Sequence, residues 1–532
     1  MTSSPSSNTV SDINMNRFFR ALGAIERAGN MLPHPFWLFW ILAGILGLAS
    51  TVLSWIGVTV ILPSTGESVA VKNLFSLEGL KFAAESALDN FAEFPPLSVI
   101  IVVLLGVVIA ERSGLLSALL RVTVVRLPNR WLTFAIAFSS MVAHIMSDSA
   151  YLVMIPLGAS AFLAAGRSPM LGLMVAYVST AVGFNASPLV TPADAIRSSL
   201  AATAAKIVDP NYVVTPVATY FFTAASSVFL SVVIALVVDL VLAKRPDFTH
   251  NPTQNELSTA TEGSTPALGH ELLAEDGSSI GLTATERRAL KIIAGVLVLY
   301  VVAVAALLLP GSPLLGKNGS IVQSVVVVNI SVFIALLFAI LGMVYGRRTG
   351  TITSLSSVPA VMVDGVKSIT PVIVLFFAVS QFLAYFKWTG IGNVITVEGA
   401  ELLRSLQAPH LIIILTIIVA ISLLNMVITS GAAMWSILAP VIVPMMMYVN
   451  LAPEAAMAAF MIGDSVTNCV TPMNAYFVLA LGFMQQYRKN AGIGTLLSFT
   501  VPVASTVLVA WSTFFVVWYS LGIPLGPGVN IK

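Results

Sequence analysis

Charged residues are scarce in this chain of 532 residues. They make up 9% of the sequence, whereas an ordinary soluble domain carries roughly 25%. Hydrophobic residues account for 57%, and the mean hydropathy is +0.94. We therefore expect a membrane protein whose main solvent is lipid. The 26 basic and 24 acidic residues leave a net charge of +2, which does not indicate a polyanion-binding surface, so we expect no nucleic acid partner.

Cysteine and enzyme motifs are also lacking. The single cysteine, Cys469, excludes disulfides and any multi-cysteine metal or iron–sulfur site. There is no Gly-x-x-x-x-Gly-Lys-Ser/Thr loop and no soluble stretch large enough for a nucleotidase, which disfavours an ATP-driven pump. Neither His-Glu-x-x-His nor a serine beside a histidine occurs at a helix break, so we expect no enzyme activity.

Long apolar runs are abundant. A charge-free run of about 17 to 25 residues can cross ~30 Å of hydrocarbon as a helix. Seven clear runs are present: 36–57, 94–110, 213–238, 292–309, 321–346, 368–386 and 495–521. The first run lacks a small-residue cleavage site, so we expect it to be retained as a span. A small-molecule solute and membrane lipid are the expected partners.

Basic residues predict the orientation, because Lys and Arg in short loops stay on the cytoplasmic side. The expected location is the inner (plasma) membrane. The N-terminal segment, residues 1–35, is predicted on its cytoplasmic side because it contains Arg17, Arg20 and Arg27. Segment 58–93 is then expected outside. Segment 246–286 is rich in Ser, Thr, Gly and Glu and is predicted to be a cytoplasmic linker between two halves.

Two apolar regions are interrupted by small polar residues, glycine and proline. Segment 411–453 is charge-free but too long for one span, so we expect a re-entrant hairpin at 411–447 with its tip near Ser430. A similar hairpin is predicted at 131–165, with its tip at Asp148. Each is followed by a predicted broken helix, at 170–198 and at 453–484. The charge-derived topology closes only if the hairpins enter from opposite sides, as an inverted repeat requires.

Prolines support this repeat. Three prolines of the first half recur 284 residues later in the second: Pro156, Pro169 and Pro188 as Pro440, Pro453 and Pro472. The predicted fold is an all-α membrane protein with about nine transmembrane helices plus two re-entrant hairpins, arranged as an inverted repeat with broken helices. Its halves are predicted at 36–245 and 287–521, with a C-terminal tail at 522–532.

The hairpin tips and helix breaks are the expected functional site. Non-helical backbone at membrane depth is tolerated only where it lines a protein cavity, and intramembrane carboxylates are costly and usually functional. Candidate substrate contacts are Asp148, Ser149, Asn185, Asp194, Ser430, Gly431, Trp435, Asn468, Thr471 and Pro472. Candidate ion-coupling residues are Asn425, Asp464 and Thr467.

Each candidate has a structural alternative. Asp148 is also a favoured residue for capping the second helix of its hairpin. Asp194 is also compatible with a place near the outer interface, where ionisation costs little. The asparagines and threonines are also compatible with hydrogen bonds between helices, which small polar residues often make in membranes. Trp435 is equally compatible with plain packing.

Several short stretches of this sequence resemble the AbgT family of p-aminobenzoyl-glutamate transporters. They are Ser430–Trp435, Ile462–Asn468 with Thr471-Pro472, Ser147–Tyr151, and Gly183-Phe184 followed by Asp194. The resemblance implies a homodimer of protomers with nine transmembrane helices and two hairpins. It also implies import of p-aminobenzoyl-glutamate, or export of sulfonamide antimetabolites, driven by a proton or sodium gradient. The family's functional positions correspond to Asp194, Asn425, Trp435, Pro453, Asp464 and Pro472.

Asn425 and Asp464 resemble a sodium site of some members, and no other cofactor is expected. The chain departs from the family where members usually have Ser, Lys and Arg, because it has Ala432, Met434 and Met461. Two cations are therefore missing from the region expected to face a dicarboxylate. A less anionic or different substrate stays open, as does a cation-coupled di- or tricarboxylate transporter of the same superfamily. A channel is less expected, since it needs no pair of broken repeats.

Overall fold

The computed structural model is almost entirely helical. It describes residues 33–61, 66–125, 129–245, 282–316, 319, 321, 324–405 and 409–529. Within these residues, eight helices are long and apolar enough to cross a membrane. Seven of them overlap the apolar runs predicted from the sequence: α2 (Pro35–Ile56), α4 (Pro95–Arg112), α10 (Tyr220–Leu240), α14 (Ala284–Ala306), α16 (Ile330–Thr349), α18 (Thr370–Trp388) and α24 (Ile493–Ser520).

Two of the predicted connecting segments contain regular structure. Segment 58–93, expected as a loop, holds strands β1 (Thr59–Ile61) and β2 (Ser68–Ala70), paired antiparallel, and helix α3 (Leu77–Ala92). Helix α14 begins at Ala284, inside the predicted linker, because Thr283 and Glu286 form a capping box there. Most of that linker, and the predicted N-terminal segment up to residue 32, lie outside the described residues.

The two predicted hairpins are each a pair of helices joined by a short non-helical turn. The first consists of α6 (Leu132–Val142), the 3-10 turn η2 (Ala143–Met146) and α7 (Ser149–Ala164). Its chain reverses at Ser147, which has a φ of 48°. The second consists of α20 (His410–Asn425) and α21 (Gly431–Tyr448), and α21 is the eighth helix of membrane-spanning length.

Each hairpin is followed by an interrupted helix. The first is α8 (Pro169–Val182) and α9 (Pro192–Ala205). The second is α22 (Pro453–Val466), η6 (Thr467–Cys469) and α23 (Ala475–Tyr487). Helices α8 and α22 start 284 residues apart and end 284 residues apart. The repeat seen in the prolines is therefore also present in the bounds of these two helices. Both helices begin at a proline because proline at the first helical position has a suitable φ and has no amide hydrogen that needs a partner.

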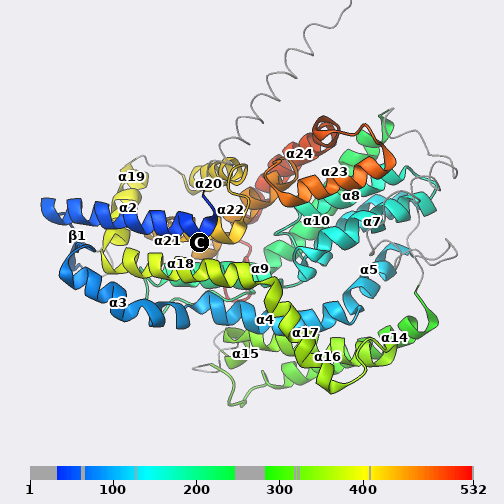
Figure 1. Cartoon of the computed structure of the whole chain (residues 1–532), viewed down its shortest axis with the longest axis horizontal. Helices are drawn as coiled ribbons and strands as arrows, with labels where there is room; N and C mark the ends of the chain where they lie inside the picture. The colour runs from blue at the N-terminus through cyan, green and yellow to red at the C-terminus, as the bar shows by residue number, and fades with distance from the viewer. Residues whose placement is uncertain are drawn as a thin grey trace, which may run out of the picture.

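Close backbone contacts hold some helices together in pairs. In Figure 1, α7 and α8 run side by side. A Cβ atom added to Gly158 of α7 would lie 2.5 Å from the Gly172 carbonyl oxygen of α8. Similarly, a Cβ atom on Gly106 of α4 would meet the Ala335 carbonyl of α16. Such contacts require glycine, because any side chain would separate the two backbones.

The two halves meet near the centre of the molecule. Helix α21 of the second half packs on α9 of the first, and α9 also packs on α4. Helix α18 packs on α2 and α3, and α20 runs along α22. The remaining short helices are α5 (Leu115–Val125), α15 (Val325–Val328), α17 (Val358–Ser368) and α19 (Ile391–Ser405), with 3-10 turns at η1 (Asn129–Trp131), η3 (Leu242–Lys244) and η5 (Leu355–Ser357). This arrangement brings both hairpin tips and both helix breaks together.

Candidate functional site

A cavity of about 510 Å³ lies where the hairpin tips meet α4, α9 and the second helix break. Its volume is within the range of ≈ 300–1,000 Å³ that small-molecule sites usually have. Six of the residues predicted from the sequence line it: Asp148, Ser149, Ser430, Gly431, Asp464 and Asn468. These six come from both halves of the chain, so the cavity belongs to the junction of the repeat.

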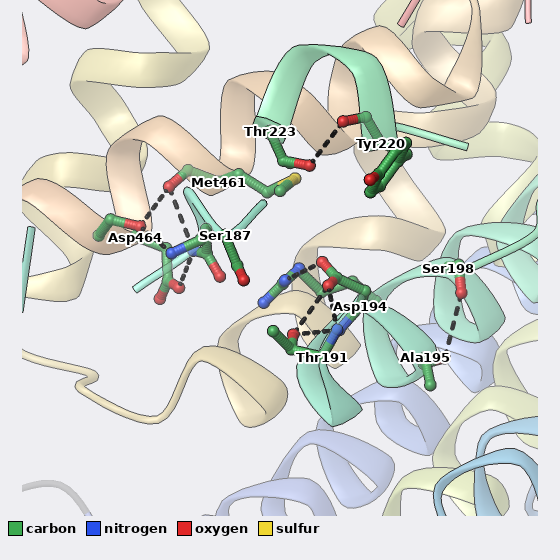
Figure 2. Close-up of polar contacts among 12 residues, drawn as sticks. Ser187, Thr191, Asp194, Ala195, Ser198, Tyr220, Thr223, Met461 and Asp464 are labelled. Atoms are coloured by element: carbon green, nitrogen blue, oxygen red, sulfur yellow. Dashed lines mark hydrogen bonds and ion pairs between the residues drawn. The ribbon is translucent and has the colours of Figure 1, made fainter. Parts of the chain in front are cut away.

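Asp464 joins the two helix breaks. It lies on α22 and is 1% exposed. Its Oδ2 accepts a hydrogen bond of 2.8 Å from Nδ2 of Asn185, which lies in the first break. Asn185 Nδ2 also donates to the Met461 carbonyl oxygen, and its backbone N–H donates to Ser465 Oγ. Figure 2 shows Asp464 with Met461 on this helix. The first break is therefore held directly against the carboxylate of the second.

Asn425, at the end of α20, is surrounded by oxygen atoms. Its Nδ2 lies 2.6 Å from the Asp464 carbonyl oxygen, 2.9 Å from Thr467 Oγ1 and 3.0 Å from Asn468 Oδ1. Three acceptors thus share the two hydrogens of one amide. In addition, the side-chain oxygens of Asn425 and Asn185 are buried and have no hydrogen-bond partner within the part of the chain that the structure describes. A surplus of oxygen acceptors beside a buried carboxylate is suited to a hard cation or to a proton.

The first hairpin tip forms a polar and aromatic wall. Asp148 precedes α7, but its side chain makes no capping hydrogen bond and lines the cavity instead. Its carboxylate interacts with the side chain of Tyr476, whose ring stacks on that of Tyr151 with centroids 4.1 Å apart and planes 3° apart. The side chain of Ser149 interacts with that of Glu111 on α4. This wall offers polar groups and an aromatic face to a solute.

Asp194 takes part in a tight local network and does not line the cavity. Its Oδ2 accepts hydrogen bonds of 2.8 Å from both the backbone N–H and Oγ1 of Thr191, at the start of α9 (Figure 2). Its Oδ1 pairs with Nη2 of Arg197 at 2.6 Å. Arg197 does line the cavity and is 4% exposed. Sequence reasoning missed it, although a charge three residues after Asp194 on a helix is the spacing of an ion pair.

Four other predicted residues lie behind the cavity wall. Trp435 is fully buried, and its Nε1 donates to the Arg197 carbonyl oxygen over 3.0 Å. Thr471 Oγ1 donates to the Met426 carbonyl oxygen over 2.8 Å, which fixes the second break to the second hairpin. Pro472 follows it, and Thr467 Oγ1 accepts a hydrogen bond from Asn425 Nδ2 over 2.9 Å. The structure therefore gives these residues contacts that position the wall.

The departures from the family pattern lie in different places. Ala432 lines the cavity, whereas Met434 and Met461 are buried and do not. The charged lining residues are Glu111, Arg112, Asp148, Arg197, Asp364 and Asp464. Asp364 pairs with Lys367 at 3.0 Å. Among the described residues there is no group of three His, Cys, Asp or Glu side chains that could hold a metal ion.

Comparison with known proteins identifies the family. The family model described as "AbgT putative transporter family" matches residues 20–532. The p-aminobenzoyl-glutamate transport protein of Escherichia coli (strain K12) is 33% identical over 509 residues, which cover 95% of this chain and 96% of that protein.

Two solved structures share the fold over their full length. The YdaH transporter of Alcanivorax borkumensis superposes with a TM-score of 0.84 at 34% identity and covers 93% of this chain and 100% of its own. MtrF of Neisseria gonorrhoeae, described as illuminating a class of antimetabolite efflux pumps, has a TM-score of 0.87 at 34% identity and covers 96% of this chain and 100% of its own. This chain therefore belongs to the AbgT family and is a multi-pass membrane transporter, not an enzyme.

Proposed function

We propose that this protein is a secondary active transporter of p-aminobenzoyl-glutamate-like aromatic amino-acid conjugates, or an exporter of sulfonamide antimetabolites, coupled to a proton or sodium gradient. The observation that carries the proposal is the position of Asp464. It lines the solute cavity and also belongs to the buried oxygen cluster around Asn425. One residue is thereby shared by the solute site and the ion site: its carboxylate accepts a hydrogen bond from Asn185, and its backbone carbonyl oxygen accepts one from Asn425.

This sharing explains how ion binding is coupled to solute binding. A sodium ion beside Asn425 and Asp464, or a proton on Asp464, neutralises a negative charge on the cavity wall. Because electrostatic repulsion is strong away from water, an anionic solute then binds the ion-loaded state better. Such a difference in affinity is what a coupling mechanism needs. The unpaired side-chain oxygens of Asn425 and Asn185 supply further ligands for the cation.

The cavity supports an aromatic solute. Tyr151 and Tyr476 both line it and are stacked on each other, and aromatic faces bind other rings in offset or edge-to-face arrangements. p-Aminobenzoyl-glutamate and sulfonamides share an aminobenzene ring. The aromatic wall and the names of the relatives favour these solutes over the di- or tricarboxylates considered from the sequence.

The proposal includes a homodimer in the inner membrane with a cytoplasmic N-terminus. Arginines before α2 support this orientation, since basic residues stay cytoplasmic. Helix α14 exposes a row of large apolar side chains, among them Val298, Leu299 and Val302, which supports contact with lipid or with a second protomer. Crosslinking in native membranes tests the dimer, and accessibility of single cysteines near the N-terminus tests the orientation.

Uptake into proteoliposomes tests the function. The purified protein is reconstituted, and entry of radiolabelled p-aminobenzoyl-glutamate or sulfamethoxazole is followed under imposed sodium or proton gradients. We expect gradient-driven transport by the wild type and its loss in Asp464→Asn. Glu85→Gln is the matched control, because Glu85 is an exposed carboxylate on α3. Absence of transport of both solutes by the wild type under either gradient contradicts the proposal.

A further inference from the structure

Arg197 is a buried cation on the wall of the solute cavity. It lies on α9, and its side chain is 5% exposed. Pro192, Ala193 and Ile196 of the same helix line the cavity beside it. A charged side chain within a membrane protein is costly and is normally paired or in contact with a transported species. The N–H groups of Arg197 are therefore expected to have partners.

That pairing is incomplete. Nη2 of Arg197 contacts Asp194 Oδ1 at 2.6 Å, but Nε of Arg197 is buried and has no hydrogen-bond partner among the described residues. A guanidinium carries five N–H donors and no acceptor, and a buried donor without a partner is unfavourable. One oxygen of Asp194 thus satisfies only part of the group.

Asp194 cannot turn to provide a second contact without losing others. Its Oδ2 is held by the backbone N–H and the hydroxyl of Thr191. The main chain of Arg197 is fixed as well, because its carbonyl oxygen accepts a hydrogen bond from Trp435 Nε1 of α21. Asp194 therefore holds the guanidinium in a defined position, and Trp435 of α21 fixes the backbone of the same residue. A preorganised fork of this kind binds a carboxylate with little loss of entropy.

The other charges of the cavity indicate when an anion binds there. Asp464 is close enough to Arg197 for an electrostatic interaction and is itself hydrogen-bonded to Asn185. An anion at Arg197 is repelled by an ionised Asp464 and tolerated when Asp464 carries a cation or a proton. Two further carboxylates line the cavity, Glu111 on α4 and Asp148 at the first hairpin tip. The second arginine of the cavity, Arg112, lies on α4 next to Glu111.

We propose that Arg197 binds a carboxylate of the transported solute, with Asp194 as its positioning residue. The inference rests on the proposed function, because it takes the cavity to be the solute site. It adds that the solute is an organic anion and names the cation that receives it. The family usually has Lys and Arg where this chain has Met434 and Met461, and neither methionine lines this cavity. Arg197 supplies a positive charge on the cavity wall itself.

Binding of charged and neutral probes to the purified, full-length protein tests the proposal. The probes are p-aminobenzoyl-glutamate and its uncharged dimethyl ester, measured by equilibrium dialysis at saturating sodium and at a mildly acidic pH at which both probe carboxylates stay ionised. For Arg197→Gln we expect the Kd of the dianion to rise about 30-fold or more, as expected for the loss of a desolvated charge pair. The Kd of the ester is expected to change less than about twofold, in the range of a surface-like effect. Arg197→Lys is expected to recover part of the loss.

The double variant Asp194→Asn/Arg197→Gln separates this role from a structural one. It removes both charges of the pair, so no unpaired carboxylate is left to unfold α9, and its melting temperature checks that it is folded. We expect it to lose affinity for the dianion as Arg197→Gln does. Equal changes for the dianion and the ester, or no change for either, overturn the proposal.

A failure of the proposed function is distinguishable, because it is seen in the wild type. If the wild type binds neither form of p-aminobenzoyl-glutamate, benzoate and benzamide serve as the probe pair. Benzoate binding that is lost in Arg197→Gln supports an anion site at Arg197 with a different solute. Equal binding of benzoate and benzamide, or binding of neither, overturns the assignment of Arg197.

Discussion

A methyl group on Gly431 would lie 2.9 Å from each carboxylate oxygen of Asp464. The first residue of α21 therefore packs directly against the carboxylate of α22, with no room for a side chain. The positive end of the α21 dipole also lies at this point. Glycine at the second hairpin tip thus allows the helix N-terminus to approach the acidic group that the proposed coupling uses.

Gly431→Ala is expected to reduce transport strongly. The added methyl group displaces Asp464 from Asn185 or pushes the hairpin tip away, and we expect gradient-driven uptake to fall about 10-fold or more, as for small misplacements of reacting or binding groups. Uptake in proteoliposomes measures this. Gly482→Ala is the control, because a Cβ atom there has nothing within 4 Å. Wild-type uptake by Gly431→Ala would show that the close contact is dispensable.

Asn425→Ala is expected to weaken ion coupling. The substitution removes the amide that contacts three oxygen atoms, including Thr467 Oγ1 and Asn468 Oδ1, and it removes one proposed cation ligand. A buried acceptor that loses its partner costs about 1–3 kcal/mol, so we expect the ion concentration for half-maximal uptake to rise about 5-fold or more. Sodium titrations and pH titrations of uptake identify which ion is affected. An unchanged dependence on both ions would contradict the proposed ion site.

Tyr476 allows the aromatic and polar contributions to be separated. Tyr476→Phe keeps the ring that stacks on Tyr151 and removes the hydroxyl that contacts Asp148. Tyr476→Ala removes both. Since aromatic pairs contribute about 0.5–1.5 kcal/mol beyond their burial, we expect KM for an aminobenzene solute to rise about 3- to 10-fold in the Ala variant and less in the Phe variant. Equal KM values for all three proteins would show that this wall does not contact the solute ring.

Gly158→Ala tests the packing of α7 on α8. Its Cβ atom would lie 2.5 Å from a backbone oxygen of α8, and a backbone cannot rotate away as a side chain can. Overpacking of this kind typically costs about 1–3 kcal/mol. We therefore expect a lower apparent melting temperature for the purified protein in detergent, with Gly482→Ala again unchanged. A melting temperature equal to that of the wild type would mean that the two helices adjust at little cost.

The hairpins and interrupted helices could be predicted because their causes are local. Chain reversals at membrane depth favour small polar residues such as Ser147, which has a φ of 48°, and helix restarts favour prolines such as Pro169 and Pro453. By contrast, α3 reads as a charged loop in the sequence. It is a helix because Ser76 caps its start and because Asn90 contacts Gln381 of α18 at 3.0 Å, a contact between residues far apart in the chain.

The site was predictable in composition but not in orientation. Asp464 and Asp148 stand out as isolated carboxylates, and both line the cavity. Whether Asp194 or Arg197 faces the cavity depends on how α9 packs against α21, and Trp435 contacts Arg197 only because of that packing. A sequence pattern gives the spacing of such groups along a helix, but the neighbouring helix decides which of them meets the solute.

The glycine contacts also limit how access to the cavity can change. Helices α7 and α8 touch backbone to backbone at Gly158 and Gly172, as do α4 and α16 at Gly106, so each pair has to travel as one rigid block. The cavity is lined by α4 of one block and by the first hairpin tip with the start of α7 of the other, so it lies at the junction of the two blocks. Opening toward either side of the membrane therefore requires the blocks to shift past each other, and the path of the solute lies between them.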